Sequence, residues 1–167
     1  MTDHLLLIGK KLEHLSRMRA YLVYSLEQIS KLMPIQLWAS LTPEHHQILA
    51  AFRVRFSEFQ EQLGKTMRAI AIEEEQKADT FTAVLLYMEK LEIIETSDRW
   101  KELRELRNAI NHEYEEDSAR LAEFFSELVR ATPQLFAWHE NLTKFCMQNY
   151  ASSSTNSGTN GNNKGHA

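Results

Sequence analysis

The chain has 167 residues, 43% of them hydrophobic, which is enough to bury one sizeable core and gives no reason to expect two domains. Its 5 glycines and 3 prolines are few, and Gly158, Gly161 and Gly165 fall in the last ten residues, so the body favours an all-α protein. The net charge of −4 argues against a broadly basic surface for non-specific nucleic-acid binding, although it leaves room for a local basic cleft.

The cysteine content and the hydropathy indicate the compartment. The single cysteine, Cys146, excludes an intramolecular disulfide and is typical of a reducing compartment. The apolar run at residues 5–8 is too short for the core of a signal peptide or for a membrane span. We therefore expect a cytoplasmic protein with no membrane partner.

Two long helices are predicted first. Apolar residues recur at steps of three and four from Asp3 to Met33, which predicts one long amphipathic helix ended by Pro34. Residues 42–44, a hydroxyl, a proline and an acid, are the start signals of a second helix. Its apolar stripe continues until the charged residues 73–77.

Shorter helices are predicted after these two. A third begins at about Asp79, and a fourth begins near the capping residue Ser97. A fifth follows Asp117, and Thr132-Pro133 either restarts a sixth helix or kinks the fifth. The predicted fold class is an all-α, up-down helical bundle, with two long antiparallel helices and three or four shorter ones.

The chain changes character near its end. Residues 1–150 carry the helical patterns and are predicted to form the bundle. Residues 151–167 contain no large apolar side chain, so they cannot offset the entropy of ordering. We expect them to be a disordered polar tail.

Most motifs that carry chemistry are absent from the sequence. It has no glycine-rich phosphate loop, no cysteine pair for zinc and no His-Glu-x-x-His helix, so neither a metal nor a cofactor is predicted. His45 and His46 are adjacent and point about 100° apart on a helix, which favours a surface role. Cys146 lies on an apolar stripe and is interpreted as a buried small hydrophobe, and the acidic residues 73–75 as a solvated helix end.

The run RELRNAINHEYEED, residues 104–117, is the most unusual stretch of the chain. Residues three or four apart on a helix share a face, so the run forms two neighbouring polar columns, Arg104–Asn108–His112 and Arg107–Asn111–Tyr114. Arg107 and His112 lie about 140° apart around the axis and ~7.5 Å apart along it, so within one helix they diverge. They would meet only if the helix bends or two copies pack together. From spacing alone, a catalytic site and a hydrated or inter-helix polar face are equally open.

The eight residues Arg107-Asn-Ala-Ile-Asn-His-Glu-Tyr114 resemble the Arg-x4-His-x-Tyr motif of HEPN-domain ribonucleases. They are most similar to the HepT-like toxins, which are encoded beside minimal nucleotidyltransferase antitoxins. The order of predicted helices agrees, so the resemblance covers residues 3 to about 148. It implies a HEPN-like bundle and a homodimer in which the two motifs face each other across a cleft.

The resemblance also implies a metal-independent endoribonuclease toxin that uses the ribose 2′-OH of RNA as nucleophile. His112 would be the general acid and base, because the ordinary pKa of histidine, about 6.5, suits proton transfer at neutral pH. Arg107 would hold the scissile phosphate and stabilise the charge on its oxygens. Asn108 would orient the imidazole or the phosphate, with Arg104 and Asn111 as supporting residues. The need for a 2′-OH would leave DNA uncleaved.

Tyr114 has a separate role in the resemblance. In HepT-like proteins the matching tyrosine accepts AMP from the partner nucleotidyltransferase, which would place a bulky anion beside Arg107 and His112. Two other functions stay open: a non-catalytic substrate-binding subunit of a minimal nucleotidyltransferase, and a helical interaction protein whose polar column serves dimer packing. The full motif favours the ribonuclease, because packing needs neither this histidine nor this tyrosine.

Overall fold

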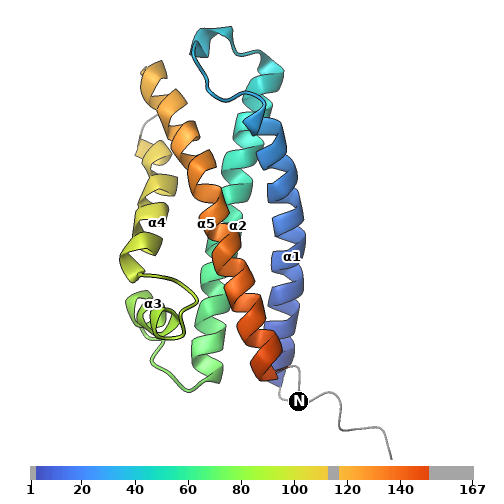
Figure 1. Cartoon of the computed structure of the whole chain (residues 1–167), viewed down its shortest axis with the longest axis vertical. Helices are drawn as coiled ribbons and strands as arrows, with labels where there is room; N and C mark the ends of the chain where they lie inside the picture. The colour runs from blue at the N-terminus through green and yellow to red at the C-terminus, as the bar shows by residue number, and fades with distance from the viewer. Residues whose placement is uncertain (1–2, 113–116, 151–167) are drawn as a thin grey trace, which may run out of the picture.

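The computed structural model describes residues 3–112 and 117–150, with the backbone alone for residues 110–112. The predicted tail, residues 151–167, lies outside the described residues. The elements in chain order are α1 Asp3–Ser30, the short 3-10 helix η1 Trp38–Ser40, α2 Pro43–Glu73, α3 Phe81–Lys90, α4 Ser97–His112 and α5 Ser118–Tyr150 (Figure 1). All regular structure in this part of the chain is helical, which confirms the predicted all-α bundle.

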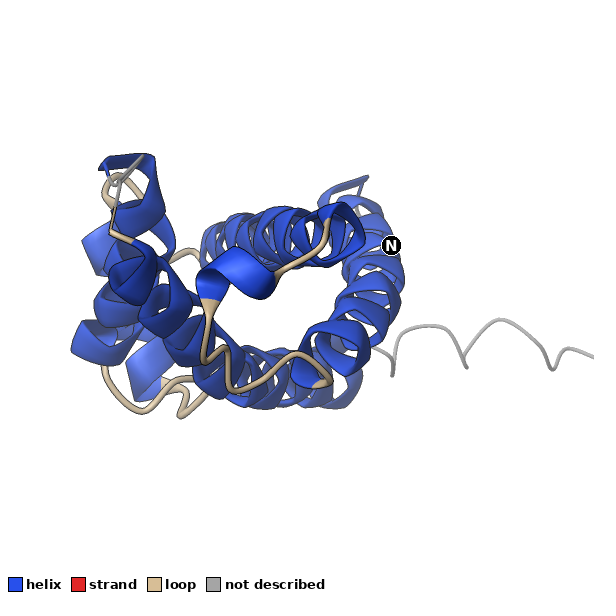
Figure 2. Cartoon of the chain, turned by 90° about the horizontal axis from the view of Figure 1, so that it is seen from above, coloured by secondary structure: helices blue, strands red, loops and turns tan. Residues whose placement is uncertain are grey.

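Three long helices form the body of the bundle. α1 and α2 run antiparallel along the length of the molecule, and α5 packs against both (Figure 1). The shorter α3 and α4 lie to one side, where α4 packs against α2 and α5. Seen from above, the loop that carries η1 connects α1 to α2 and crosses the end of the bundle (Figure 2). No helix in the described part is both long and apolar enough to cross a membrane.

The start of α2 lies at the predicted residues. The Thr42 hydroxyl accepts a hydrogen bond from the His45 backbone N–H, and His45 Nδ1 accepts one from the Thr42 N–H, each 3.2 Å long. The ring of His46 meets Trp38 edge-on, with 5.3 Å between the centroids. Both histidines therefore have structural roles at this end of the bundle.

Two helix ends depend on local backbone chemistry. α1 stops at Ser30, three residues before the predicted Met33, and the Leu32 and Met33 N–H groups donate to the Ile29 and Ser30 carbonyls as turn bonds. Pro34 has no N–H to bond the Ser30 carbonyl four residues before it, so the helix cannot continue. α2 ends where Glu75 adopts the left-handed conformation, with φ 56°, and the Gln76 N–H donates to the Ala71 carbonyl over 2.9 Å. This second end lies inside the predicted range.

Pro133 does not divide the last helix. α5 continues from Ser118 to Tyr150 with Pro133 inside it, so the fifth and sixth predicted segments are one element and the bundle has a third long helix. Proline removes one backbone donor, and the Thr132 hydroxyl nearby donates to the Leu128 carbonyl over 2.8 Å. Buried Leu135 and Trp138 hold the following turn in the core.

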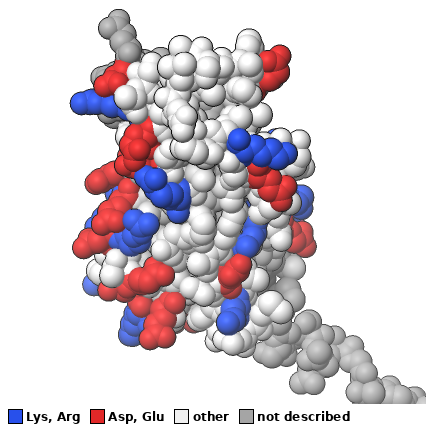
Figure 3. Space-filling model, turned by 45° about the horizontal axis from the view of Figure 1, so that its top comes forward, with Lys and Arg blue, Asp and Glu red and all other residues white. Residues whose placement is uncertain are grey.

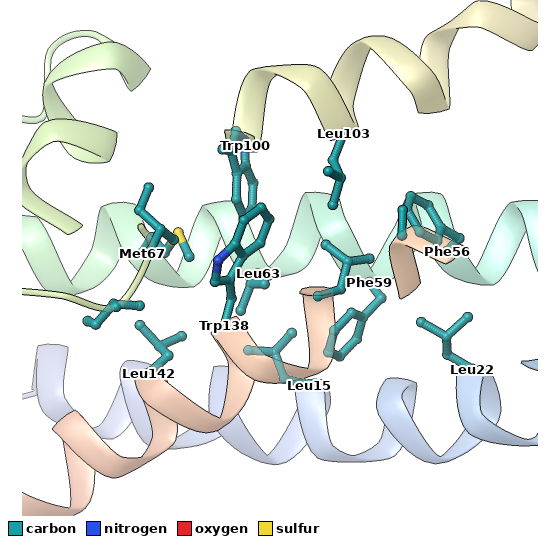
Figure 4. Close-up of a cluster of buried hydrophobic side chains, with 14 of the residues drawn as sticks. Leu15, Leu22, Phe56, Phe59, Leu63, Met67, Trp100, Leu103, Trp138 and Leu142 are labelled. Carbon is teal, nitrogen blue, oxygen red and sulfur yellow. The ribbon is translucent and has the colours of Figure 1, made fainter. Parts of the chain in front are cut away.

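The core is filled by aliphatic and aromatic side chains from all five α-helices. α4 contributes Trp100 and Leu103, which point inward between α2 and α5 (Figure 4). The rings of Trp100 and Trp138 pack with 5.3 Å between their centroids. The Trp138 indole N–H donates to the Glu95 carboxylate over 2.8 Å, so this buried donor is satisfied at the edge of the core.

The acidic residues at the end of α2 accept hydrogen bonds from the start of α1 and from the end of α5. Glu73 accepts a hydrogen bond from His4 over 2.8 Å, and Glu74 accepts one from the Tyr150 hydroxyl over 2.5 Å. Both carboxylates are half-buried, so the interpretation of residues 73–75 as a merely solvated helix end was incomplete. Cys146 is a buried free thiol, and burial, with the charge of Glu74, raises its pKa to about 12. The interpretation of Cys146 as a buried small side chain is confirmed.

Candidate functional site: a groove between α2 and α4

The position of α4 is fixed by its first two turns. The Thr96 hydroxyl accepts a hydrogen bond from the Arg99 backbone N–H over 3.1 Å, which begins the helix. Trp100 and Leu103 are buried in the core. Arg104 and Arg107 follow Trp100 and Leu103 by four residues each, so they lie on the same face of α4. This places them at the edge of the contact between α4 and α2.

Arg104 and Arg107 line a pocket of about 190 Å³ between the two helices. Its wall is made by residues of α2, α3 and α4, namely Gln60, Glu61, Gly64, Lys65, Arg68, Phe81, Trp100, Arg104 and Arg107. Gly64 lets the aromatic rings approach α2 closely, since a Cβ there would stand 3.1 Å from Phe81 Cζ and 3.2 Å from Trp100 Cζ2. This pocket is called the aromatic pocket below.

A second pocket, of about 330 Å³, adjoins the first. It is lined by Arg53, Val54, Ser57, Glu58, Glu61, Arg107 and Asn108. Glu61 and Arg107 line both pockets, so the two form one surface depression, which is called the α2–α4 groove below. The α2 residues from Arg53 to Arg68 span ~22 Å at the helical rise of about 1.5 Å per residue.

Arg107 is at the boundary between the two pockets, and it lines both. It is half-buried, and its Nη1 donates to the Ser57 carbonyl of α2 while its Nε donates to the Asn108 side-chain oxygen, each over 3.4 Å. Burial lowers the pKa of Arg107, the charge of Glu61 raises it and the charge of Arg104 lowers it. Arginine titrates so far above neutrality that the guanidinium stays charged. A permanent cation is therefore held at the centre of the groove.

The groove is basic on a chain that is acidic overall. Its lining includes five basic side chains, Arg53, Lys65, Arg68, Arg104 and Arg107, against the two acidic ones Glu58 and Glu61. The whole chain carries a net charge of −4. On the face shown in Figure 3, lysine and arginine are interspersed with acidic residues and do not form a broad patch. The positive charge of the groove is thus a local feature, of the kind that attracts an anion.

The predicted site residues divide into two groups. Arg104, Arg107 and Asn108 lie together in the groove, so residues from both predicted columns meet there. Asn111 and His112 are on the last turn of α4, but their side chains lie outside the described residues. Tyr114 also lies outside them.

The α2 half of the groove was not predicted. Arg53, Ser57, Glu61 and Lys65 are spaced by four and form a polar column on α2, next to the apolar stripe that was identified. That spacing was the available signal, and Lys65 and Glu61 form an ion pair of 3.3 Å along it. A sequence alone does not show which helix a polar column faces.

Within the described residues no cluster of three or more histidine, cysteine or acidic side chains is arranged to hold a metal ion. Searches of protein-family models, curated proteins and solved structures find no match to this chain. The groove and the Arg107–Tyr114 motif, which begins in α4, are therefore the two features that indicate a function.

Proposed function

We propose that the chain is a metal-independent endoribonuclease toxin that binds RNA in the α2–α4 groove. The observation that carries the proposal is the position of Arg107, which stands at the centre of a basic groove on an otherwise acidic chain and begins the Arg-x4-His-x-Tyr motif. A forked, permanently charged donor suits a phosphodiester, whose two free oxygens accept paired hydrogen bonds.

The proposed reaction uses the RNA strand as its own nucleophile. His112 takes the proton of the ribose 2′-OH, the 2′ oxygen attacks the neighbouring phosphorus, and the bond from phosphorus to the 5′ oxygen breaks. The leaving 5′ oxygen receives a proton, so the products are a 2′,3′-cyclic phosphate and a 5′-hydroxyl. Arg107 stabilises the charge that grows on the phosphoryl oxygens, and Asn108 holds the guanidinium through its 3.4 Å contact with Nε.

We propose that two copies of the chain form the complete site. His112 follows Arg107 by five residues on one helix, so the two positions of a single copy lie about 140° apart around the axis. Pairing across a two-fold axis would bring the histidine of one copy to the arginine of the other. The exposed Val54 beside Arg53, with 47% of its surface accessible, is an apolar contact for such a pairing.

The test compares RNA cleavage by three arginine or histidine variants of the purified chain. Arg107→Ala and His112→Ala should each lower the cleavage rate by roughly 100-fold or more, and should relieve growth arrest when the chain is expressed. Arg17→Ala is the matched control, because Arg17 is exposed on α1 and outside the groove. A 2′-deoxy strand should stay intact. Cleavage that survives both substitutions, or a chain that is monomeric by light scattering while active, would contradict the proposal.

A second function, the non-catalytic subunit of a nucleotidyltransferase, is favoured by Glu58 and Glu61, which weaken the attraction of the groove for phosphate. The two functions differ in the fate of Tyr114. For the toxin, co-expression with its cognate nucleotidyltransferase should add AMP to Tyr114, and intact-mass measurement should detect the addition, which Tyr114→Phe should abolish. An unmodified chain that tightly binds an active nucleotidyltransferase and cleaves no RNA would establish the second function.

A further inference from the structure

The aromatic pocket contains a buried polar side chain with no partner. Gln60 is 1% exposed, and neither its side-chain oxygen nor its side-chain nitrogen makes a hydrogen bond within the described part of the chain. It lines the pocket together with Gly64 and Arg104. Buried amides are nearly always paired, so an unpaired one requires an explanation.

Packing does not explain this glutamine. Gln60 interrupts the apolar stripe of α2, between the fully buried Phe59 and Leu63, where leucine or methionine would fill the same space without a polar group. An amide offers one acceptor and two donors side by side. Its natural complement is a group that presents a donor beside an acceptor, as the edge of a nucleobase does.

The rest of the pocket suits the other parts of a nucleotide. Lys65, Arg68 and Arg104 are cations at its wall, and phosphate is their usual ligand. Phe81 is half-buried there, with the Arg68 guanidinium 5.6 Å from its ring centroid, and an aromatic ring of this kind stacks on bases. The volume of about 190 Å³ is below the ~300–1,000 Å³ of pockets for drug-sized ligands, so one base fits and a dinucleotide does not.

We propose that the aromatic pocket is a base-recognition subsite for one nucleotide of a single-stranded RNA. The Gln60 amide bonds the base edge, Phe81 contacts the base, and Arg68, Arg104 and Lys65 hold its phosphate. The identity of the ligand as RNA rests on the proposed function. The subsite deepens that function, since it sets which nucleotide lies beside the phosphate held by Arg107.

The test measures the binding of fluorescent 2′-O-methyl oligonucleotides, which lack the nucleophile and are not cleaved. Gln60→Met keeps the shape of the side chain and removes its hydrogen-bonding groups. It should weaken binding of base-containing strands roughly tenfold and leave binding of an abasic strand unchanged. Arg68→Ala should weaken both strands and reduce the slope of log affinity against log salt by about one. Gln62→Met, two residues away on α2 and outside the groove, should bind as the unaltered chain does.

Each other outcome overturns the subsite. Equal affinity of Gln60→Met and the unaltered chain for base-containing strands would mean that water satisfies the amide. Binding of 5′-mononucleotides without binding of strands would assign the pocket to a free nucleotide. Failure of the proposed ribonuclease looks different: the unaltered chain would still show the Gln60-dependent preference for bases, yet cut no unmodified strand. Circular dichroism of each variant confirms that the bundle is folded.

Discussion

Gly9 and Gly64, the two glycines within the described helices, provide a matched test of how closely α3 and α4 pack on α2. Gly9 lies in α1, and a Cβ at this position would meet no other atom within 4 Å. Gly64 lies in α2, and its Cβ would stand 3.1 Å from Phe81 Cζ and 3.2 Å from Trp100 Cζ2. The same substitution to alanine therefore has different consequences at the two positions.

The expected magnitudes follow from two opposing effects. Alanine is favoured over glycine in a helix interior by about 1 kcal/mol, so Gly9→Ala should raise the free energy of unfolding by roughly 0.5–1 kcal/mol. Gly64→Ala gains the same amount and loses about 1–3 kcal/mol to overpacking. Trp100 is 2% exposed, and its ring centroid lies 5.8 Å from that of Phe81 and 5.3 Å from that of Trp138. Its ring therefore has no free space into which it could move away from a new methyl group. We expect a net loss of about 1 kcal/mol for Gly64→Ala.

Urea unfolding followed by circular dichroism measures both variants. The two free energies of unfolding should differ by about 2 kcal/mol, or several degrees in Tm for a chain of this size. Gly64→Ala should also weaken RNA binding, because its methyl group enters the aromatic pocket. If both alanine variants are stabilised equally, then Phe81 and Trp100 do not pack closely on Gly64, and the described shape of the groove is wrong.

Two further predictions concern buried polar groups. Burial and the charge of Arg19 lower the pKa of His139 from 6.5 to about 4, although the charge of Glu140 raises it. Between these pH values, this histidine is therefore protonated only in the unfolded chain. Stability should be complete above about pH 6.5 and fall by up to about 3 kcal/mol towards pH 4, and urea unfolding of His139→Gln across this range should lack that part of the slope. Glu95→Ala leaves the Trp138 indole N–H without its 2.8 Å acceptor and should cost about 1–3 kcal/mol, whereas Glu95→Gln, which keeps an acceptor, should cost less; equal losses would contradict the role of this hydrogen bond.

The sequence predicts the helices well because the signals for them are local. The start of α2 follows from capping residues within four positions of one another, and apolar spacing of three and four gives the long helices. The effect of Pro133 is not local. Whether a proline ends a helix or lies within it depends on what holds the next turn, and here that is the burial of Leu135 and Trp138 against other helices.

The same distinction applies to the groove. The α4 residues Arg104, Arg107 and Asn108 were predicted together because they lie in one short polar run, residues 104–117, in which Arg107 and Asn108 begin the motif and Arg104 is a supporting residue. The contact of Arg107 with Ser57 joins residues 50 apart in sequence, and no periodicity reports which faces of two helices meet. Gln60 was missed for another reason: it stands inside an apolar stripe, where the pattern shows a core position and not the lack of a hydrogen-bond partner.

The charges in the groove bear on how it would distinguish RNA from other polyanions. Five basic side chains are opposed by Glu58 and Glu61, and Glu61 is paired with Lys65 at 3.3 Å and also lines the wall beside Arg107. Phosphate contacts supply affinity but no sequence information, and each acidic neighbour reduces that affinity. On the proposed function, a groove with this balance would hold an RNA strand weakly through charge alone. The proposed contacts to the base, from Gln60 and Phe81, would then be a larger share of the binding free energy, so selectivity between strands should increase as the contribution from charge decreases.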